Sequence, residues 1–323
     1  MSRPDVFNTH IHLPPNFSAF NTVDEALDQA AAEGCVLLGA SNYYDFSVYE
    51  PFVSGARERG IHPSCGIEIL CRDEVAAKEG VRYNDPANPG KVYLCGKGLV
   101  RWKDPTPRAK ELLSRIRRAD EARMAEMAER LQSEFGGGPD AGTIVARVAE
   151  RHGVPAETVV LQERHLAQAY AEASGQDATE IRSRLMKAGR PAFVEESYVS
   201  LEEGIELVRE LGGIPAYPFV ADGMNPVSER ERDLPALIER LQERGIHAAE
   251  FISSRNSPEV LADYVLKLWS EGFPVTCGTE HNTGERMPLL PRCKDGSPIP
   301  EPVMEVFWKS ALKIKEHESN ARP

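Results

Sequence analysis

The chain has 323 residues, of which 41% are hydrophobic and 27% are charged. These values are typical of a folded globular protein and exclude a disordered chain or a fibrous repeat. Lysine and arginine number 38 against 50 aspartates and glutamates, a formal charge of −12 that disfavours long nucleic acid as a partner. A local basic pocket can still bind a small anion.

The sequence lacks the signals of export and of membrane insertion. No apolar segment of the length that a signal peptide needs precedes His10, and no run approaches the roughly 18 apolar residues of a membrane span. We therefore expect a cytoplasmic location and no membrane partner. The six cysteines contain no C-x-x-C pair, so we expect reduced and mostly buried thiols.

Short apolar runs alternate with segments of helical period in the first hundred residues. Gly34 and Gly60 stand where the C-caps of two helices are expected. The predicted elements are a strand at 6–7, a helix at 24–33, a strand at 35–40, a helix at 48–59 and a strand at 65–70.

The pattern changes between 103 and 190, where helical periodicity continues without a convincing strand. We expect an inserted helical subdomain there, between a first α/β part at 1–102 and a second at 191–323. The stretch GGGP at 136–139 interrupts the insertion, and it lacks the strand context that a phosphate-binding glycine loop requires.

The alternation of strands and helices returns in the last part of the chain. Repeated βα units with nearly continuous apolar strands predict a parallel sheet, either flat or closed into a barrel. A final amphipathic helix is expected at 303–315. The other predicted elements are helices at 201–211, 234–244 and 258–271 and strands at 214–217, 247–252 and 273–277.

Two histidines follow the first predicted strand in the sequence NTHIH at 8–12. Because the side chains of an extended segment alternate, His10 and His12 point to the same side. Such a pair at the C-terminal end of a strand begins a metal site or is simply polar surface. Glu68 lies in the apolar run CGIEIL, where a buried carboxylate must be paired, protonated or bound to a cation. This position favours a ligand role for Glu68.

Two further groups of polar residues are candidates for chemistry. Glu280, His281 and Asn282 follow the last predicted strand and are expected at the same end of the sheet. Arg164 and His165 start a helix of the insertion, where they suit a phosphate or carboxylate, although two exposed polar residues are almost as good an interpretation. The remaining histidines are interpreted as structural or exposed: His62, His152, His247 and His317.

Several motifs, in this order and spacing, resemble the PHP (polymerase and histidinol phosphatase) family. The resemblance spans nearly the whole chain, and its later motifs are similar to the branch of small-molecule phosphoesterases with a helical insertion. The motifs are NTHIH at 8–12, SNYYD at 41–45, GIEI at 66–69, KVYLCG at 91–96, RHLAQA at 164–169 and GGIPAYP at 212–218.

The resemblance implies a distorted (β/α)7 barrel with a metal cluster at the C-terminal end of its strands. Arg164 and His165 match residues that approach the phosphate of the substrate. Where the family motif reads Asp, any residue, His, this chain has Glu280, His281 and Asn282, so either Asn282 or His281 takes the place of the final histidine. The matching ligand positions are His10, His12, Glu68 and Glu280.

Three positions at which the family supplies histidine ligands hold tyrosines: Tyr43, Tyr93 and Tyr217. A neutral phenol, with a pKa near 10, is a poor ligand for Zn²⁺ or Mn²⁺ and donates a hydrogen bond instead. The ligands of the first metal are retained while those of the others are lost. We therefore expect one divalent ion per chain (Zn, Mn or Fe), with the three tyrosines and His281 as candidate catalytic groups and Arg164, His165 and Asn282 as substrate contacts.

Three functions fit these residues. The first is a metal-dependent hydrolase of a small phosphorylated, anionic substrate. The second keeps the metal but performs isomerisation, epimerisation or elimination on a sugar or sugar acid, with a tyrosine as proton donor. The third is a catalytically inactive binding or regulatory protein. Metal content separates the third from the other two.

Overall fold

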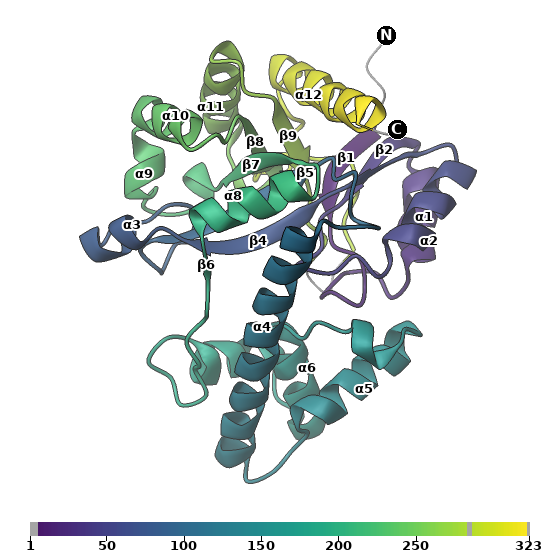
Figure 1. Cartoon of the computed structure of the whole chain (residues 1–323), viewed down its shortest axis with the longest axis vertical. Coiled ribbons are helices and arrows are strands. Elements are labelled where there is room, and N and C mark those ends of the chain that lie inside the picture. Colours follow the sequence, from purple (N-terminus) through teal and green to yellow (C-terminus); the bar gives the residue numbers. More distant parts are fainter. Residues whose placement is uncertain (1–5, 283–285, 322–323) are drawn as a thin grey trace.

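A computed structural model describes residues 6–282 and 286–321 and has mixed α/β architecture (Figure 1). The strands form two sheets, and most helices of the first and last parts of the chain pack against them. The long helix α4 (Pro107–Phe135) leads from the sheets to a separate group of helices.

The first sheet contains three parallel strands in the order β1 (Val6–Ile11), β2 (Cys35–Ala40) and β3 (His62–Cys65). Helices α1 (Val23–Ala32) and α2 (Tyr49–Glu58) connect them. Helix α1 begins after Thr22, whose side chain accepts a hydrogen bond from the backbone N–H of Glu25. The helices and strands predicted for this part are confirmed, except that the strand expected at 65–70 is divided.

Gly66 divides that strand into β3 and β4 (Ile67–Arg72). A Cβ atom here would lie 2.6 Å from Ser41 Oγ and 2.8 Å from the carbonyl oxygen of Gly96, so a larger residue does not fit. The two halves then pair differently: β3 extends the first sheet and β4 pairs with β5 (Lys91–Lys97). Glu68 therefore belongs to the second sheet, but its backbone N–H still donates to Asn42 of the segment after β2.

The second sheet has the strand order β6-β4-β5-β7-β8-β9. Strand β5 is antiparallel to β4 and to β7, which corrects the prediction of an entirely parallel sheet. Only the short helix α3 (Glu74–Glu79) stands between β4 and β5, so the chain returns without the crossover that parallel strands require. The other strands are β6 (Val199–Ser200), β7 (Ile214–Phe219), β8 (Ala248–Ile252) and β9 (Val275–Gly278).

The two sheets meet again through the segment after β9. The backbone N–H of His12 donates to the carbonyl oxygen of Glu280 at 2.7 Å. The backbone N–H of Glu280 donates to the carbonyl oxygen of His10 at 2.9 Å. The ends of β1, β2, β4 and β9 are thus brought together at one place. Helices of the last part cover the second sheet: α8 (Leu201–Glu210), α9 (Glu229–Arg232), α10 (Leu234–Glu243), α11 (Pro258–Ser270) and α12 (Glu301–Asn320).

No strand lies between β5 and β6, a stretch that the structure describes completely. Its helices have a hydrophobic cluster of their own, which includes Met127, Leu131, Leu166 and Tyr170. The GGGP stretch separates the first two helices, as predicted. The elements are α4 (Pro107–Phe135), α5 (Ala141–His152), α6 (Glu163–Ser174), α7 (Ala178–Ile181) and a π-helical turn at Arg182–Met186.

The structure shows the state of the cysteines and the character of the helices. All six cysteines are buried and none forms a disulfide, as the sequence predicts. Among the described residues, no helix combines the length and the apolar character needed to cross a membrane.

Candidate metal centre and the adjoining cavity

His10, His12 and Glu68 converge at the ends of β1 and β4. The two Nε2 atoms lie 3.4 Å apart, and Glu68 Oε2 lies 3.6 Å from His10 Nε2 and 3.3 Å from His12 Nε2. All three residues are buried. The alternation of side chains along β1 places both imidazoles on one side, as the H-x-H spacing predicts.

These three residues fit a metal ion. Ligand atoms about 2.1 Å from a tetrahedral cation lie about 3.4 Å from one another, which is the spacing found here. Within the described part of the chain, Glu68 Oε2 and His12 Nδ1 have no hydrogen-bond partner although both are buried. A carboxylate oxygen facing two imidazole nitrogens needs a cation or protons between them. The arrangement therefore accommodates a divalent ion.

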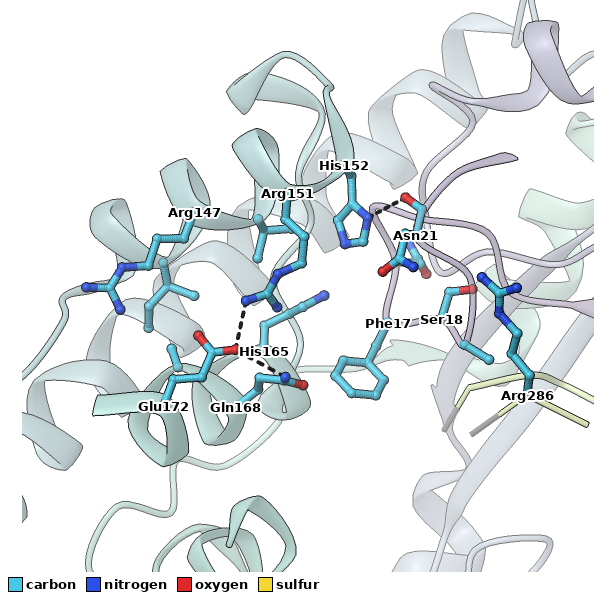
Figure 2. A pocket seen from close by; sticks show the side chains of 15 residues that line it. Phe17, Ser18, Asn21, Arg147, Arg151, His152, His165, Gln168, Glu172 and Arg286 are labelled. Carbon is cyan, nitrogen blue, oxygen red and sulfur yellow. Dashed lines mark hydrogen bonds and ion pairs between the residues drawn. The ribbon is translucent and has the colours of Figure 1, made fainter. Parts of the chain in front are cut away.

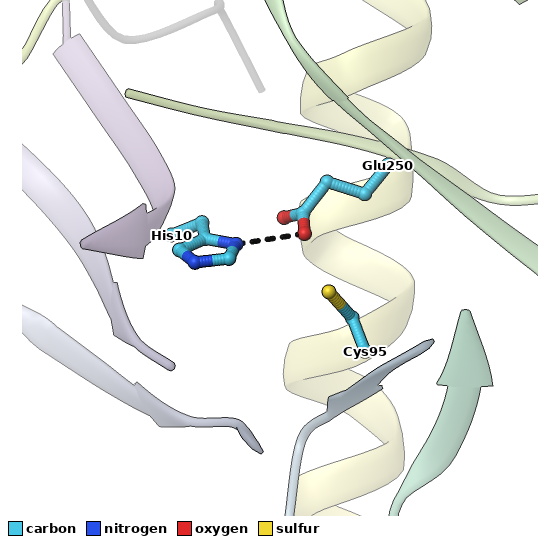
Figure 3. Close-up of side chains that lie close together, drawn as sticks. All are labelled: His10, Cys95 and Glu250. Carbon is cyan, nitrogen blue, oxygen red and sulfur yellow. Dashed lines mark hydrogen bonds and ion pairs between the residues drawn. The ribbon is translucent and has the colours of Figure 1, made fainter. Parts of the chain in front are cut away.

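Glu250 lies beside His10 (Figure 3), and Lys97 pairs with Glu250. Glu250 Oε2 is 2.8 Å from His10 Nδ1, and the ammonium group of Lys97 forms an ion pair with Glu250 Oε1. Cys95 lies close enough to His10 and Glu250 for these three to form a second possible ligand group. The Lys97 ammonium already supplies the positive charge that Glu250 needs.

Opposite charges set the protonation of this group in the absence of metal. Burial by itself would lower the pKa of His10, and the charge of Lys97 acts in the same direction. The charge of Glu250 and the hydrogen bonds to Glu250 and Glu68 together outweigh them and raise the pKa to about 9. Burial would raise the pKa of Glu250, but Lys97 and then His10 lower it to about 2. Burial would also raise the pKa of Glu68, but the hydrogen bonds and charges of His10 and His12 lower it below its usual value. Both carboxylates are ionised at neutral pH and can serve as anionic groups.

Tyr43 connects the three candidate ligands to a cavity. Its hydroxyl donates a hydrogen bond of 2.8 Å to Glu68 Oε1, and its ring stacks on His12 with ring centres 5.3 Å apart. Burial and the nearby Glu68 raise the pKa of Tyr43 well above its usual value, so the phenol stays neutral. Tyr43 orients Glu68 so that Oε2 faces the histidines.

Replacing Tyr43 with phenylalanine is expected to weaken metal binding about 10-fold, because Glu68 loses the donor that orients it. The free energy of unfolding should change by only about 1 kcal/mol, since the ring and its stacking on His12 remain. Competition with a chelator measures the affinity. Tyr44→Phe is the matched control, because the Tyr44 hydroxyl accepts from the Leu70 N–H and not from the cluster. Equal affinities for the two variants would contradict this role.

A cavity of about 770 Å³ lies between the sheets and the helices of the insertion. Tyr43, Tyr93, Arg164 and Asn282, which the sequence singled out, all line it. The ammonium group of Lys91 lies 5.2 Å from the centre of the Tyr93 ring. Four candidate residues from distant parts of the chain therefore face one space.

Arg164 is a cation of this cavity that lacks a partner among the described residues. Its guanidinium lies 5.5 Å from the centre of the Phe17 ring and makes no ion pair or hydrogen bond with the described residues. Burial, and then repulsion by Arg182, lowers its pKa. A half-buried guanidinium without a counter-ion favours binding of an anion.

His165 faces a different cavity, of about 310 Å³, which Figure 2 shows. Its Nδ1 accepts a hydrogen bond of 3.0 Å from the backbone N–H of Gln162 at the start of α6, and its ring contacts Phe17. Burial, followed by the charges of His152 and Arg151, lowers its pKa to about 3. His165 and Arg164 thus line different cavities. The neutral ring of His165 caps the start of α6.

This burial makes the protein sensitive to acid. Between pH 6.5 and about 3 the unfolded chain binds a proton at His165 that the folded chain does not, so stability falls as the pH is lowered. Chemical denaturation should show a loss from this group of about 2 kcal/mol between pH 7 and pH 5. His165→Gln should lack this contribution, whereas His247→Asn, at an exposed position, should behave like the wild type. An unchanged pH dependence in His165→Gln would disprove the assignment.

The backbone of Glu280 is hydrogen-bonded to that of His10 and His12, but the side chains of Glu280 and His281 have other partners. Glu280 Oε2 pairs with Arg255 and accepts a hydrogen bond of 2.7 Å from the amide of Asn282. His281 uses both ring nitrogens, at 2.7 Å from Thr279 Oγ1 and 2.9 Å from the carbonyl oxygen of Met287. Neither residue belongs to a close group of possible ligands among the described side chains.

Tyr217 also lies away from the cluster. Its hydroxyl donates to Glu231 Oε1 at 3.0 Å, and its ring packs beside Phe219. In the β7–β8 register, Pro218 is opposite Glu250 and Tyr217 is opposite Ala249. Because successive side chains point to opposite faces, Tyr217 faces away from the side on which Glu250 meets His10.

Glu250 and Lys97 are not among the candidate residues predicted from the sequence. Glu250 lies in the apolar strand AAEFI, and the argument used for Glu68 applies to it equally. Lys97 ends β5 after a glycine and carries no comparable signal, because a lysine at a strand end is usually exposed.

No family model and no curated protein sequence matches the chain. A protein from Bifidobacterium adolescentis, described as a metal-dependent phosphoesterase, is similar with a TM-score of 0.69 and 16% identity, over 95% of this chain and 98% of that one. An amidohydrolase from Chromobacterium violaceum, with bound sulfate and no metal, is similar with a TM-score of 0.64 and 20% identity, over 93% and 96%. This chain shares their fold. At these identities the likeness extends to the fold alone.

Proposed function

We propose that the protein is a metal-dependent hydrolase of phosphoesterase type that acts on a small anionic substrate with a single divalent ion (Zn, Mn or Fe). The observation that carries the proposal is the triangle of His10, His12 and Glu68, with sides of 3.3 to 3.6 Å, next to a large cavity. The unpartnered Arg164 in that cavity supports an anionic substrate. The fold shared with a described phosphoesterase agrees with it.

His10, His12 and Glu68 would hold the cation. Glu280 is left out of this set because Arg255 already neutralises its carboxylate. When bound, the metal would polarise a phosphoryl oxygen and lower the pKa of water.

The residues of the cavity would bind and orient the substrate. Arg164 is suited to hold phosphoryl oxygens by paired N–H donors. Tyr93 and Asn282 line the same space and would contact the rest of the substrate. The helices on the opposite wall would exclude water from the reacting groups.

We further propose that the two sheets form one distorted barrel of seven strands, with the helical insertion at 103–190 between parts at 1–102 and 191–323. The β3 and β4 segments count as one strand in this arrangement, and the two-residue strand β6, which pairs only with the end of β4, lies outside it. Hydrogen bonds between β1 and the end of β9, and between Asn42 and Glu68, support it. The separate hydrophobic cluster of the insertion supports the division.

Elemental analysis of the purified protein, followed by assays with phosphomonoesters, phosphodiesters and sugar acids, tests the function. We expect one equivalent of a divalent metal and hydrolysis of a phosphorylated compound that stops after chelation. Turnover of a sugar acid alone would instead indicate the isomerase, epimerase or lyase alternative. A protein that binds no metal and turns over no compound would refute the proposal and favour a binding role.

A further inference from the structure

Lys97, the last residue of β5, is buried, and buried lysines are rare. Its side chain is 3% exposed. The ammonium group pairs with Glu250 and lies 3.3 Å from the carbonyl oxygen of Thr9 and 3.4 Å from Ser41 Oγ. Burying an ammonium and a carboxylate together is costly and often stabilises a protein no better than apolar residues would. The pair therefore calls for a role other than stability.

The position of Glu250 indicates that role. One carboxylate oxygen faces Lys97 and the other lies 2.8 Å from His10 Nδ1, so the carboxylate lies between the lysine and the imidazole. The opposite ring nitrogen of His10, Nε2, faces His12 and Glu68. A carboxylate that accepts from one nitrogen leaves the other available for a metal.

We propose that Lys97 and Glu250 are a positioning pair for His10. Glu250 accepts the Nδ1–H of His10 and holds the ring with Nε2 toward the metal position, and Lys97 holds Glu250 in place. Because Lys97 is also fixed by Thr9, which precedes His10 in β1, the lysine ties strands β1, β5 and β8 together behind the site. By pairing with Glu250, the lysine also neutralises the carboxylate of the second possible ligand group, which His10, Cys95 and Glu250 form. This inference rests on the metal site proposed above.

The double variant Lys97→Met/Glu250→Leu tests the pair, because it removes both charges together and leaves neither one buried alone. We expect it to bind Zn²⁺ about 10- to 100-fold more weakly than the wild type in chelator competition, the usual cost of losing such a partner of a ligating histidine. In the metal-free wild type, NMR should show a downfield, slowly exchanging ring N–H signal of His10, and the double variant should lack it.

Lys91→Met/Glu196→Leu is the matched control. Lys91 and Glu196 form another largely buried ion pair, 2.6 Å apart, which does not contact His10. Its removal should leave zinc affinity within about twofold and the His10 signal unchanged, which separates positioning from the general loss of a buried pair.

Each outcome decides the proposal. A folded Lys97→Met/Glu250→Leu protein with zinc affinity within twofold of the wild type would overturn it, as would a wild-type spectrum without the His10 N–H signal. The spectrum decides the matter even if the double variant does not fold. A wild type that binds zinc but hydrolyses no phosphoester would refute the proposed function and leave the positioning pair in place.

Discussion

Replacing His10 and His12 with alanine is expected to abolish binding of the divalent ion. Two of the three converging ligand atoms disappear, so the loss should exceed the roughly 10- to 100-fold change that follows removal of an outer partner. Equilibrium dialysis with elemental analysis measures the bound metal. Phosphoesterase activity, if it depends on this ion, should fall to background in the same variant.

The controls separate loss of ligands from loss of fold. His10→Ala/His12→Ala leaves Glu68 buried with Tyr43 as its remaining hydrogen-bond donor, which costs stability. A triple variant that also carries Glu68→Ala removes that charge, and it should fold while binding no metal. His247→Ala, at an exposed histidine, should retain one equivalent. Two or more equivalents of a colourless divalent ion in the wild type would contradict the single-metal proposal.

Replacing Arg164 with alanine is expected to lower kcat/KM for a phosphorylated substrate about 10- to 100-fold. The substrate would lose its hydrogen bonds to a charged group, and such bonds contribute roughly 1.5 to 3 kcal/mol to binding. Metal content should not change, because Arg164 lies in the cavity and outside the ligand group. Steady-state kinetics and metal analysis on the same preparation measure both quantities.

Arg147→Ala serves as the control for a general change in charge. Arg147 belongs to the same helical region but lines the smaller cavity with His165 (Figure 2), so its loss should leave kcat/KM unchanged. Arg164→Lys should recover part of the activity, because lysine keeps the charge and loses the paired donors. Equal kinetics for Arg164→Ala and the wild type would remove Arg164 from the substrate site.

Ion pairs neutralise two of the three carboxylates at or near the proposed metal site. The carboxylate of Glu250 is balanced by Lys97, and that of Glu280 by Arg255. Only Glu68 keeps an unpartnered oxygen toward the histidines among these three carboxylates. The charge pattern therefore favours one position for a cation.

Local sequence patterns determined the secondary structure and the centre of the candidate site. Apolar periodicity and glycine caps located most helices and strands to within a few residues. The spacing of His10 and His12, and the burial of Glu68 in an apolar strand, identified the three residues that converge. These features depend on neighbours in the chain, because a strand alternates its faces whatever lies opposite it.

The tertiary structure alone decided the contacts that depend on strand register and on long-range pairing. The antiparallel course of β5 and the register of β7 turn Tyr217 away and bring Lys97 to Glu250. The adjacent residues Arg164 and His165 enter different cavities because a helix points successive side chains in different directions. The partner of a buried charge comes from a distant strand, and no local pattern specifies it.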